Sequence, residues 1–414
     1  MSNKEERKAP VLRFKGFTDD WEQRKLDDTI THKSGTSIEK YFSSKGLYKV
    51  ISIGSYGSNG KYIDQGIRAA ANEKTNSHLI KKGELSMVLN DKTGGKIIGR
   101  VLLIEKNNQY VVNQRSEIIK LSTSLWDPQF AFTYLNGPFR KKVLRIMQGG
   151  TQNYVNFSSV KKLTASLTSV KEQKEIGTLF QKLDNIIILQ QRKLNELKEV
   201  KKTLLSQLFP SKGQYRPIIR FKKFTNKWTK RKLGNIAKII GGGTPSTSNH
   251  DYWNGNINWY SPTEIGNNIF VNSSNKKISI KGLNNSSAKL LPGGKTILFT
   301  SRAGIGNMAI MLTDGCTNQG FQSWVIDDTK IDIYFLYSLG RLLKHDAIRQ
   351  ASGSTFLEIS NKEVKKLLLE IPSFTEQKLI GNMLRKIDDD IVRQKERIIL
   401  ITKIKKNLLQ KLFV

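Results

Sequence analysis

The sequence predicts an α+β protein made of two pseudo-symmetric α/β domains, joined by two long helices that form an antiparallel coiled coil. Three observations predict this class. Landmarks of the first half recur in the second half, two long segments carry a helical repeat of apolar residues, and the remaining segments alternate short apolar runs with turn residues. A chain of 414 residues is also longer than one hydrophobic core usually supports.

The clearest repeat is an opening motif, which reads RFKGFTDDWEQRKL at 13–26 and RFKKFTNKWTKRKL at 220–233. Nearer the end of each half, EQKEIG at 172–177 matches EQKLIG at 376–381. The landmarks keep the same order in both halves, which indicates that a whole domain and an attached element are duplicated. A period of roughly 200 residues is too long for a solenoid, whose units span about 20–50 residues.

The attached element is expected to be a helix, over about 171–209 in the first half and about 375–413 in the second. Apolar residues recur in both segments with a period near 3.5, separated by Lys, Glu, Arg and Gln. Gly177 and Gly381 weaken each helix near its start by about 1 kcal/mol. Each helix has one narrow apolar stripe, so we expect the two helices to pair, and antiparallel pairing fits a chain that must return after a globular unit.

These patterns predict four segments. They are a first globular domain at 1–158, a central helical spacer at 159–212, a second globular domain at 213–362 and a C-terminal helical spacer at 363–414. Runs such as IIGRVLLIE and KTILFT, separated by Gly, Asn and Asp, predict short strands within both domains.

The charge balance favours a nucleic-acid partner. Lys and Arg number 69 against 35 acidic residues, which gives a net charge of +34, and such a surplus repels itself unless a polyanion binds. The alternatives are a basic protein with solvated lysines and an anionic membrane surface, although no basic amphipathic terminal helix supports the second. We expect a cytoplasmic protein, because there is no apolar run of about 18 residues, no signal-peptide core at the start and a single cysteine, Cys316.

Motifs that resemble catalytic or cofactor sites are incomplete. DPQF at 127–130 is close to the loop with which adenine methyltransferases hold a flipped base, but Gln129 replaces the second proline and no glycine-rich cofactor motif precedes it. We interpret Asp127-Pro128 as the start of a helix. GGKT at 293–296 lacks the earlier glycine of a phosphate-binding loop. The four histidines are scattered and no CxxC is present, so no metal site is expected.

The stretch GGGTPSTSNHDYWNGNINWYSPTEI at 241–265 is expected to be a loop that turns into a strand. Hydroxyl and amide groups on such a loop can reach base edges or phosphates, and a nearby arginine can read guanine. We expect Trp253 and Trp259 to be buried residues that support the loop.

This stretch resembles the opening of a target-recognition domain in the specificity subunit of type I restriction-modification systems. The resemblance covers essentially the whole chain and includes the duplicated W…RKL openings, NQ at 113–114 and 318–319, the GT and GS pairs before each long helix, and the EQK motifs. The first half departs from the pattern, because KSGTSIEKYFSSKGLYKVISI replaces the Gly-Gly-Thr-Pro-Ser loop there.

The resemblance implies a non-catalytic subunit with two recognition domains, each of which binds one half of a split double-stranded DNA sequence. The helices would set the spacing and dock the partners, which are two adenine-N6 methyltransferase subunits and the ATP-driven restriction and translocase subunits. S-adenosylmethionine, ATP and Mg would be bound by those partners and not by this chain. The alternatives are a stand-alone DNA methyltransferase or nuclease, and a single-strand or RNA-binding protein that stacks bases on aromatic side chains.

DNA-facing residues are expected on the loops that both halves share. In the second domain they are Thr244, Ser246, Ser248, Asn249, Ser301, Arg302, Asn318, Gln319 and Thr355. In the first domain they are Lys92, Lys96, Arg100, Asn113, Gln114, Arg115 and Thr151.

Overall fold

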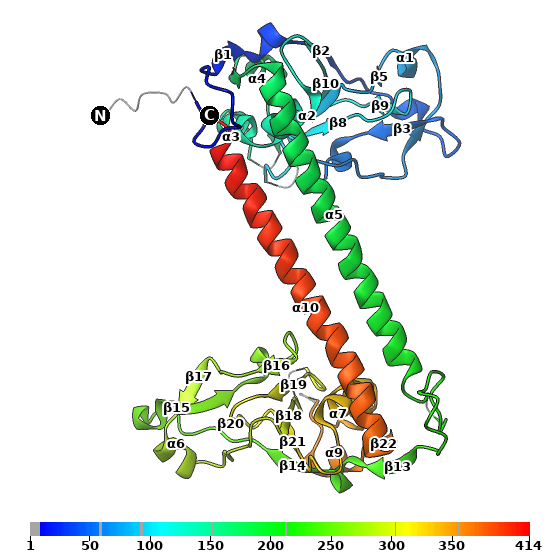
Figure 1. Ribbon diagram of the computed structural model, residues 1–414, viewed down its shortest axis with the longest axis vertical. Coiled ribbons are helices and arrows are strands. Elements are labelled where there is room, and N and C mark those ends of the chain that lie inside the picture. Colours follow the sequence, from blue (N-terminus) through cyan, green and yellow to red (C-terminus); the bar gives the residue numbers. More distant parts are fainter. Residues whose placement is uncertain are drawn as a thin grey trace. The chain divides into compact units, whose positions relative to one another are not determined.

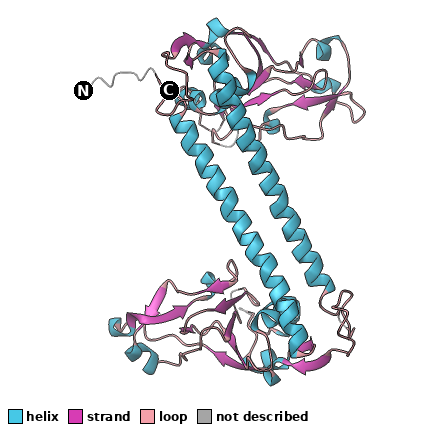
Figure 2. Ribbon diagram, in the orientation of Figure 1, coloured by secondary structure: helices cyan, strands magenta, loops and turns pink. Residues whose placement is uncertain are grey.

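The computed structural model of the chain describes residues 9–57, 60–91, 94–150, 152–211, 213–302, 304–353 and 357–414. The chain divides into two compact units, the first made of 1–191 with 396–414 and the second of 192–395. Each unit therefore contains one α/β domain and one end of each long helix (Figures 1 and 2). None of the helices in the described ranges is long and apolar enough to cross a membrane.

The first unit contains two four-stranded sheets and two short strand pairs. Its strands are β1 (Glu22–Lys25), β2 (Ile30–Ser34), β3 (Tyr48–Ile51), β4 (Arg68–Ala69), β5 (Leu79–Ile80), β6 (Leu85–Val88), β7 (Asn90–Asp91), β8 (Val101–Leu103), β9 (Tyr110–Val112), β10 (Ser116–Leu121), β11 (Asn153–Tyr154) and β12 (Thr164–Leu167). Its helices are α1 (Glu73–Asn76), α2 (Pro128–Asn136), α3 (Pro138–Arg145) and α4 (Phe157–Val160), followed by the long helix α5 (Val170–Gln207).

The second unit contains a five-stranded sheet, a three-stranded sheet and one short strand pair. Its strands are β13 (Thr229–Lys232), β14 (Ala237–Gly241), β15 (Trp253–Tyr260), β16 (Phe270–Val271), β17 (Lys276–Ile278), β18 (Thr296–Phe299), β19 (Met308–Met311), β20 (Gly315–Thr317), β21 (Gln322–Ile326) and β22 (Leu368–Ile371). Its helices are α6 (Ile280–Asn284), α7 (Ile333–Gly340), α8 (Lys344–Gln350) and α9 (Asn361–Lys366), followed by the long helix α10 (Phe374–Lys411).

The two units share one strand topology. The order β2-β10-β6-β8 in the first unit corresponds to β14-β21-β18-β19 in the second. The parallel pair β3–β9 corresponds to the parallel pair β15–β20, and the antiparallel pair β1–β12 corresponds to β13–β22. The expected duplication of an α/β domain is therefore confirmed at the level of strand pairing.

Each copy of the opening motif contacts one end of each long helix in its own unit. Trp21 is buried against Phe413, with ring centroids 6.1 Å apart, and Trp228 is buried against Phe209 at 6.2 Å. Each Trp therefore packs against a Phe that lies just after the C-terminal end of a long helix, and this contact lies in the hydrophobic core of its own unit.

An arginine of each motif holds the start of the helix that leaves the same domain. Arg13 donates two hydrogen bonds to the buried carboxylate of Glu172, at 2.7 and 2.8 Å. Arg220 makes the same bidentate contact with Glu376. A bidentate arginine–carboxylate pair holds both side chains in a defined orientation. The opening motif and the EQK motif therefore make the same contact in each unit.

The two long helices are 38 residues each and pack against each other, as the apolar period predicts. Ion pairs join them in both units, between Asp184 and Lys405 in the first and between Lys201 and Asp388 in the second, each at 2.5 Å. The earlier residue of α5 pairs with the later residue of α10, which confirms the antiparallel arrangement.

Candidate nucleic-acid interface

Two loops of the second unit meet where the sequence predicts DNA contacts. The loop after β14 crosses the loop before β21 so closely that a Cβ on Gly242 would lie 1.9 Å from the carbonyl oxygen of Asn318. Only glycine fits this crossing. The amide of Gly243 donates to the carbonyl of Thr317 at 2.8 Å, and the hydroxyl of Thr244 donates to Oε1 of Gln319. The structure thus brings Thr244 and Gln319 together at the surface.

Two tryptophans support the first of these loops, as expected, although only Trp259 is buried and Trp253 is partly exposed. The indole of Trp259 is buried and donates to the carbonyl of Gly243 at 2.8 Å, while that of Trp253 donates to the carbonyl of Ser246 at 3.0 Å. The two rings meet edge to face at 5.1 Å. Their hydrogen-bonding groups are used within the loop, so the tryptophans position its backbone.

The tip of this loop is polar and largely open to solvent. The hydroxyls of Ser246 and Ser248 lie 2.7 Å apart and both residues are exposed. Asn249 accepts the amide of Asp251 at 3.0 Å, so part of its side chain closes the turn that follows. Hydroxyl pairs of this kind can reorient to donate to a phosphate or a base edge.

A cleft of about 740 Å³ lies beside the crossing of the two loops. Arg302 and Asn318 line it together with Thr263 and Glu358. The guanidinium of Arg302 is 3.9 Å from the carboxylate of Glu358, and about a third of its side chain is exposed. Oδ1 of Asn318 accepts the amide of Gly320 at 2.8 Å, which fixes the orientation of the Asn318 amide group.

Ser301 lies beneath this cleft and not on its surface. The residue is fully buried, and its hydroxyl donates to Glu358 at 3.4 Å. Its carbonyl accepts the amide of Ile359 at 3.0 Å. Ser301 can therefore influence a ligand only through Glu358 and the neighbouring Arg302.

The first unit builds the same loop crossing without the Gly-Gly-Thr-Pro-Ser sequence. A Cβ on Gly35 would lie 2.1 Å from the carbonyl oxygen of Asn113. Glu39, which follows on this loop, accepts the amide groups of Asn113 at 3.0 Å and Gln114 at 2.9 Å. Hydrogen bonds from Ser37, and then from Asn113 and Gln114, lower the pKa of Glu39 to about 2, so its carboxylate is ionised at neutral pH.

The other basic candidates of the first unit are spread over more than one surface. Lys96 is exposed and Arg115 is exposed on a turn with φ 68°. Arg100 lines a separate hollow with Asp184 and Lys405, and burial lowers the pKa of its guanidinium. The structure does not group Arg100 with Asn113 and Gln114. Lys92, Thr151 and Thr355 lie outside the residues that the structure describes.

Sequence reasoning missed two acidic members of these loops, Glu39 and Glu358. Each joins segments far apart in the chain, since Glu39 contacts 113–114 and Glu358 contacts 301–302. Their position in the sequence could have indicated this role, because each is an acidic residue on a loop shared by both halves of a strongly basic chain.

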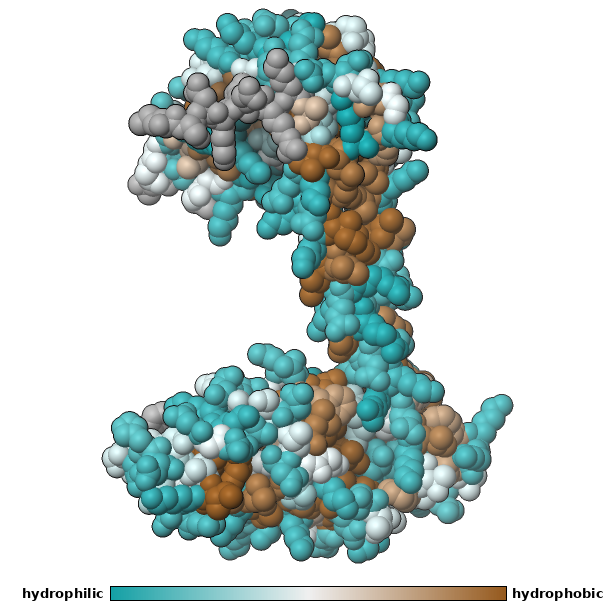
Figure 3. Space-filling view, turned by 60° about the vertical axis from the view of Figure 1, so that its left-hand side comes forward, coloured by the Kyte–Doolittle hydropathy of each residue, from teal (hydrophilic) through white to brown (hydrophobic). Residues whose placement is uncertain are grey.

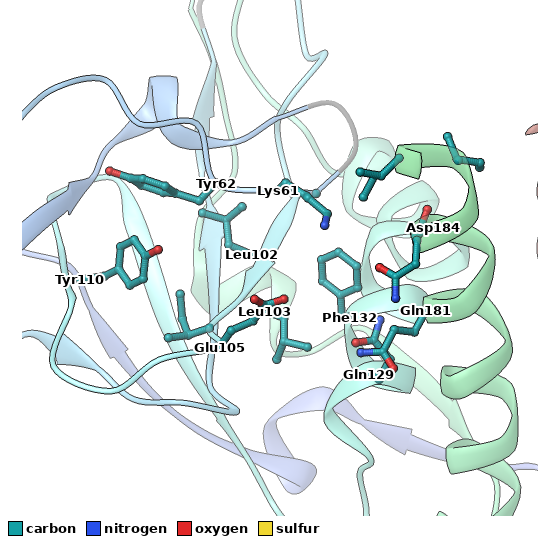
Figure 4. A pocket seen from close by; sticks show the side chains of 15 residues that line it. Lys61, Tyr62, Leu102, Leu103, Glu105, Tyr110, Gln129, Phe132, Gln181 and Asp184 are labelled. Carbon is teal, nitrogen blue, oxygen red and sulfur yellow. The ribbon is translucent and has the colours of Figure 1, made fainter. Parts of the chain in front are cut away.

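A hollow of about 290 Å³ in the first unit lies between β8, α2 and α5 (Figure 4). Tyr62, Tyr110 and Phe132 line it together with Gln129. The neighbouring Asp127 is the N-cap of α2, where Oδ1 accepts the amides of Gln129 at 3.0 Å and Phe130 at 2.9 Å. The interpretation of DPQF as a helix start is therefore confirmed. Within the described ranges no group of three His, Cys, Asp or Glu residues could hold a metal ion.

Comparisons with known proteins identify a family for this arrangement. The sequence matches the family described as the type I restriction modification DNA specificity domain twice, over residues 18–199 and 225–402. It is 32% identical over 195 residues to the MjaIX type I restriction enzyme specificity subunit of Methanocaldococcus jannaschii, an alignment that covers 46% of this chain and 45% of that protein.

A second curated relative is the EcoR124I/EcoR124II specificity subunit of Escherichia coli, which is 28% identical over 195 residues, or 45% of this chain and 47% of that protein. The chain therefore aligns with about half the length of each of these two relatives. The fold is similar to the crystal structure of a type I restriction-modification S subunit from M. genitalium. That comparison has a TM-score of 0.64 at 17% identity and covers 98% of this chain and 99% of the other.

Proposed function

The chain belongs to the family of type I restriction modification DNA specificity domains, and on that basis we propose that each of its two domains binds one half of a bipartite double-stranded DNA sequence. The observation that carries the proposal is the loop crossing that occurs once in each unit. In both crossings a glycine lies against the carbonyl of the Asn of an Asn-Gln pair, at Gly35 with Asn113 and at Gly242 with Asn318. One recognition surface per unit is what a split target requires.

The side chains at these crossings match the chemistry of base edges. Gln319 and Asn318 carry amide groups of the kind that pair with adenine, Arg302 can bind the two acceptors of guanine, and Glu39 can accept the amino group of cytosine. Thr244, Ser246, Ser248 and Asn249 would add contacts to bases or phosphates, and the exposed Lys96 and Arg115 would contact phosphates. Lys92, Arg100, Thr151 and Thr355 remain candidates of the same proposal, and Ser301 would act through Glu358.

The proposal includes the partners that such a subunit needs. Two adenine-N6 methyltransferase subunits would dock on this chain and bind S-adenosylmethionine, and the restriction subunits would bind ATP and Mg. We place the recognition domains at 1–158 and 213–362, the helical spacers at 159–212 and 363–414, and the complex in the cytoplasm. Each spacer contains near its start a strand, β12 or β22, that pairs with the preceding domain before the long helix starts.

The test is modular recognition. Residues 213–362 are exchanged for the second domain of another family member, and methylated sites are mapped by genome sequencing of a host that carries the complex. We expect one half of the methylated sequence to change and the other half to stay as it was. A change in both halves would show that the two domains read DNA jointly.

Binding by the isolated chain separates the alternatives. We expect the affinity for duplex DNA to fall by about 10³-fold or more between 50 and 200 mM salt, for roughly six to ten phosphate contacts. A preference for single-stranded over duplex DNA would favour a stacking protein, and methylation of DNA by the isolated chain with added cofactor would favour a stand-alone enzyme. Either result contradicts the proposal.

A further inference from the structure

Exposed basic side chains are too common in this chain to identify a DNA contact by themselves. Lys and Arg number 69, and hydrophilic side chains cover much of the visible face of each domain (Figure 3). A lysine on a free loop loses backbone and side-chain freedom when it binds a ligand. A lysine whose loop is already held in one conformation loses less freedom and therefore binds more strongly.

One loop of the first unit is held in this way. We call residues 94–100, which lie between β7 and β8, the glycine loop, and the exposed Lys96 lies near its centre. Gly94, Gly95 and Gly99 have φ angles of 71°, 83° and 70°, a conformation that glycine adopts without steric cost. Glycine also loses the most backbone freedom when it becomes ordered, so the loop needs contacts from outside to keep one conformation.

Arg140 of α3 makes such contacts. Its Nε donates to the carbonyl of Ile98 at 2.8 Å, and its Nη2 donates to the carbonyls of Gly95 at 3.1 Å and Lys96 at 2.8 Å. Burial lowers the pKa of Arg140 to about 10, and the charge of Arg100 acts in the same direction, so the guanidinium is still a cation at neutral pH. A planar guanidinium can hold several carbonyls in one geometry, whereas a lysine ammonium is a point charge on a flexible stem.

The segment that carries Arg140 also packs closely against the glycine loop. A Cβ on Gly99 would lie 2.8 Å from Cγ1 of Val143 in α3, and one on Gly95 would lie 2.9 Å from Sδ of Met147, just after α3. No side chain fits at these two glycines unless the loop or its neighbours move. Close packing and the Arg140 hydrogen bonds therefore define the same loop position.

The second unit holds the equivalent loop in a related way. The EQK motifs begin at 172 and 376, and the same offset relates Arg140 to Lys344 of α8. Nζ of Lys344 donates to Oδ1 of Asn307 at 3.0 Å, and a Cβ on Gly306 would lie 2.7 Å from Cγ of Lys344. This loop carries Arg302, which lines the cleft beside the loop crossing. A cation from the same helix position therefore contacts a basic loop in both units.

We propose that Arg140 is a positioning residue, which holds the glycine loop so that Lys96 contacts a phosphate of the half-site bound by the first domain. The inference rests on the proposed function, since it assigns a role within the first recognition domain. The amide of Leu89, just before the loop, donates to the carbonyl of Arg115 at 3.0 Å, so the strand that leads to the glycine loop adjoins the turn after the Asn-Gln pair. Arg140 acts through backbone carbonyls and does not need to touch DNA.

The test is a double-mutant cycle in the full-length chain, with Arg140→Lys, Lys96→Gln and the two combined. Arg140→Lys keeps the charge and introduces the residue type that the second unit has at this position. Arg145→Gln is the matched control, because Arg145 is exposed on the same helix. Binding to duplex DNA with the bipartite sequence that is methylated in the host is titrated at several salt concentrations. Deuterium uptake of residues 94–101 is measured without DNA.

Lys96→Gln should weaken binding about fivefold, the size of an exposed charge contact, and reduce the slope of log affinity against log salt by about 0.9. Arg140→Lys should cause similar losses although it keeps the charge, and it should raise the deuterium uptake of the glycine loop. The double variant should bind no more weakly than the weaker single variant, because both residues act on one contact. Arg145→Gln should leave the uptake unchanged, and any effect on binding should multiply with that of Lys96→Gln.

Losses that multiply to about 25-fold in the double variant would overturn the inference, because Arg140 would then act independently of Lys96. So would unchanged binding or unchanged deuterium uptake in Arg140→Lys. These results leave the proposed function intact if the domain exchange still changes one half of the methylated sequence. If the wild-type chain shows no preference for that duplex, the proposed function fails, and the inference fails with it.

Discussion

At the scale of single residues, Gly177 and Gly381 show how one position can be read differently in sequence and in structure. Sequence alone gives only a glycine that weakens a helix. In the structure a Cβ on Gly177 would lie 2.7 Å from the backbone nitrogen of Phe130, and one on Gly381 would lie 2.3 Å from Oδ1 of Asp332. Both glycines let a long helix cross the N-terminus of a domain helix at close range.

We therefore expect Gly381→Ala to destabilise the protein, although alanine favours helices by about 1 kcal/mol. The added methyl would displace the Asp332 carboxylate that caps α7 through the amide of Phe335, and overpacking of this kind costs about 1–3 kcal/mol. The measurement is the urea midpoint of unfolding. Lys378→Ala, an exposed position one turn earlier on α10, is the control, and equal midpoints for the two variants would contradict the explanation.

Arg302 is the residue whose removal should affect recognition most directly. It lies in the cleft beside Asn318 and faces the carboxylate of Glu358. Arg302→Ala should weaken DNA binding and relax one base of one half-site by about 1–3 kcal/mol. The readout is binding to a library in which that half-site is randomised.

Arg302→Lys separates charge from base reading. A lysine keeps the positive charge but cannot make the planar bidentate contact, so it should restore part of the affinity and little of the base preference. If neither Arg302→Ala nor Gln319→Ala changes binding, the loop crossing of the second unit is not the recognition surface.

At the scale of elements, two ion pairs fix the register of the long helices. In the second unit Asp388 accepts Nζ of Lys201 at 2.5 Å and the hydroxyl of Tyr334 at 2.6 Å. The side chains of Lys201 and Asp388 are only 15% and 8% exposed. Burial lowers the pKa of Lys201, and the hydrogen bond to Asp388 opposes that change. The pair joins α5, α10 and α7 at one point.

Lys201→Met should therefore lower the free energy of unfolding more than the substitution of a surface lysine does. It leaves the Asp388 carboxylate buried with Tyr334 as a partner, and breaking a buried pair costs about 3–5 kcal/mol. Combining it with Asp388→Leu should recover part of the loss, because no buried charge remains. Lys366→Met is the control, since Lys366 and Glu363 form a half-exposed pair in the same unit, whose loss costs about 0–1 kcal/mol. The measurement is calorimetric unfolding of the wild type, the two single variants and the double variant. Equal stabilities of Lys201→Met and Lys366→Met would show that the buried ion pair is not needed for stability.

The elements were largely predictable from sequence, and the candidate site only in part. Apolar period and repeated motifs suffice for the long helices and the duplication, because both depend on residues close in the chain or on matched copies. The repeated Asn-Gln pairs correctly indicated one of the two loops at each crossing. The role of Glu39 was not predictable, since its partners are 74 and 75 positions away. The burial of Ser301 was not predictable either, because its contacts, with Gly320 and with Glu358 and Ile359, come from segments up to 58 positions away.

At the scale of the whole molecule, duplication gives one chain two recognition domains, and we expect the long helices to set the spacing between the two DNA half-sites. Each helix of 38 residues is about 57 Å long at 1.5 Å per residue, which exceeds one turn of DNA at about 34–36 Å. The same number of residues separates Asp184 from Lys201 in α5 and Asp388 from Lys405 in α10. A change of length that keeps the ion pairs must therefore be made in both helices.

Inserting four residues between the ion pairs in both helices should lengthen the preferred DNA spacer. Four residues add about 6 Å and, at roughly 100° per residue, a net rotation of about 40°, and a heptad seam accommodates them as a local stutter. One base pair adds about 3.4 Å and about 34–36°. The rotation matches one additional base pair and the translation matches one to two, so we expect a spacer longer by one to two base pairs with both half-sites unchanged.

The measurement is selection of bound or methylated sites from a library with randomised spacer length. The control chain carries four residues inserted at the exposed turn 106–108 of the first domain, which leaves both helices intact and should leave the spacer as it was. An unchanged spacer preference in a folded, active chain with both helices extended would mean that the helices only dock partner subunits. In that case the spacing between half-sites would have to be set by the domains and their partners.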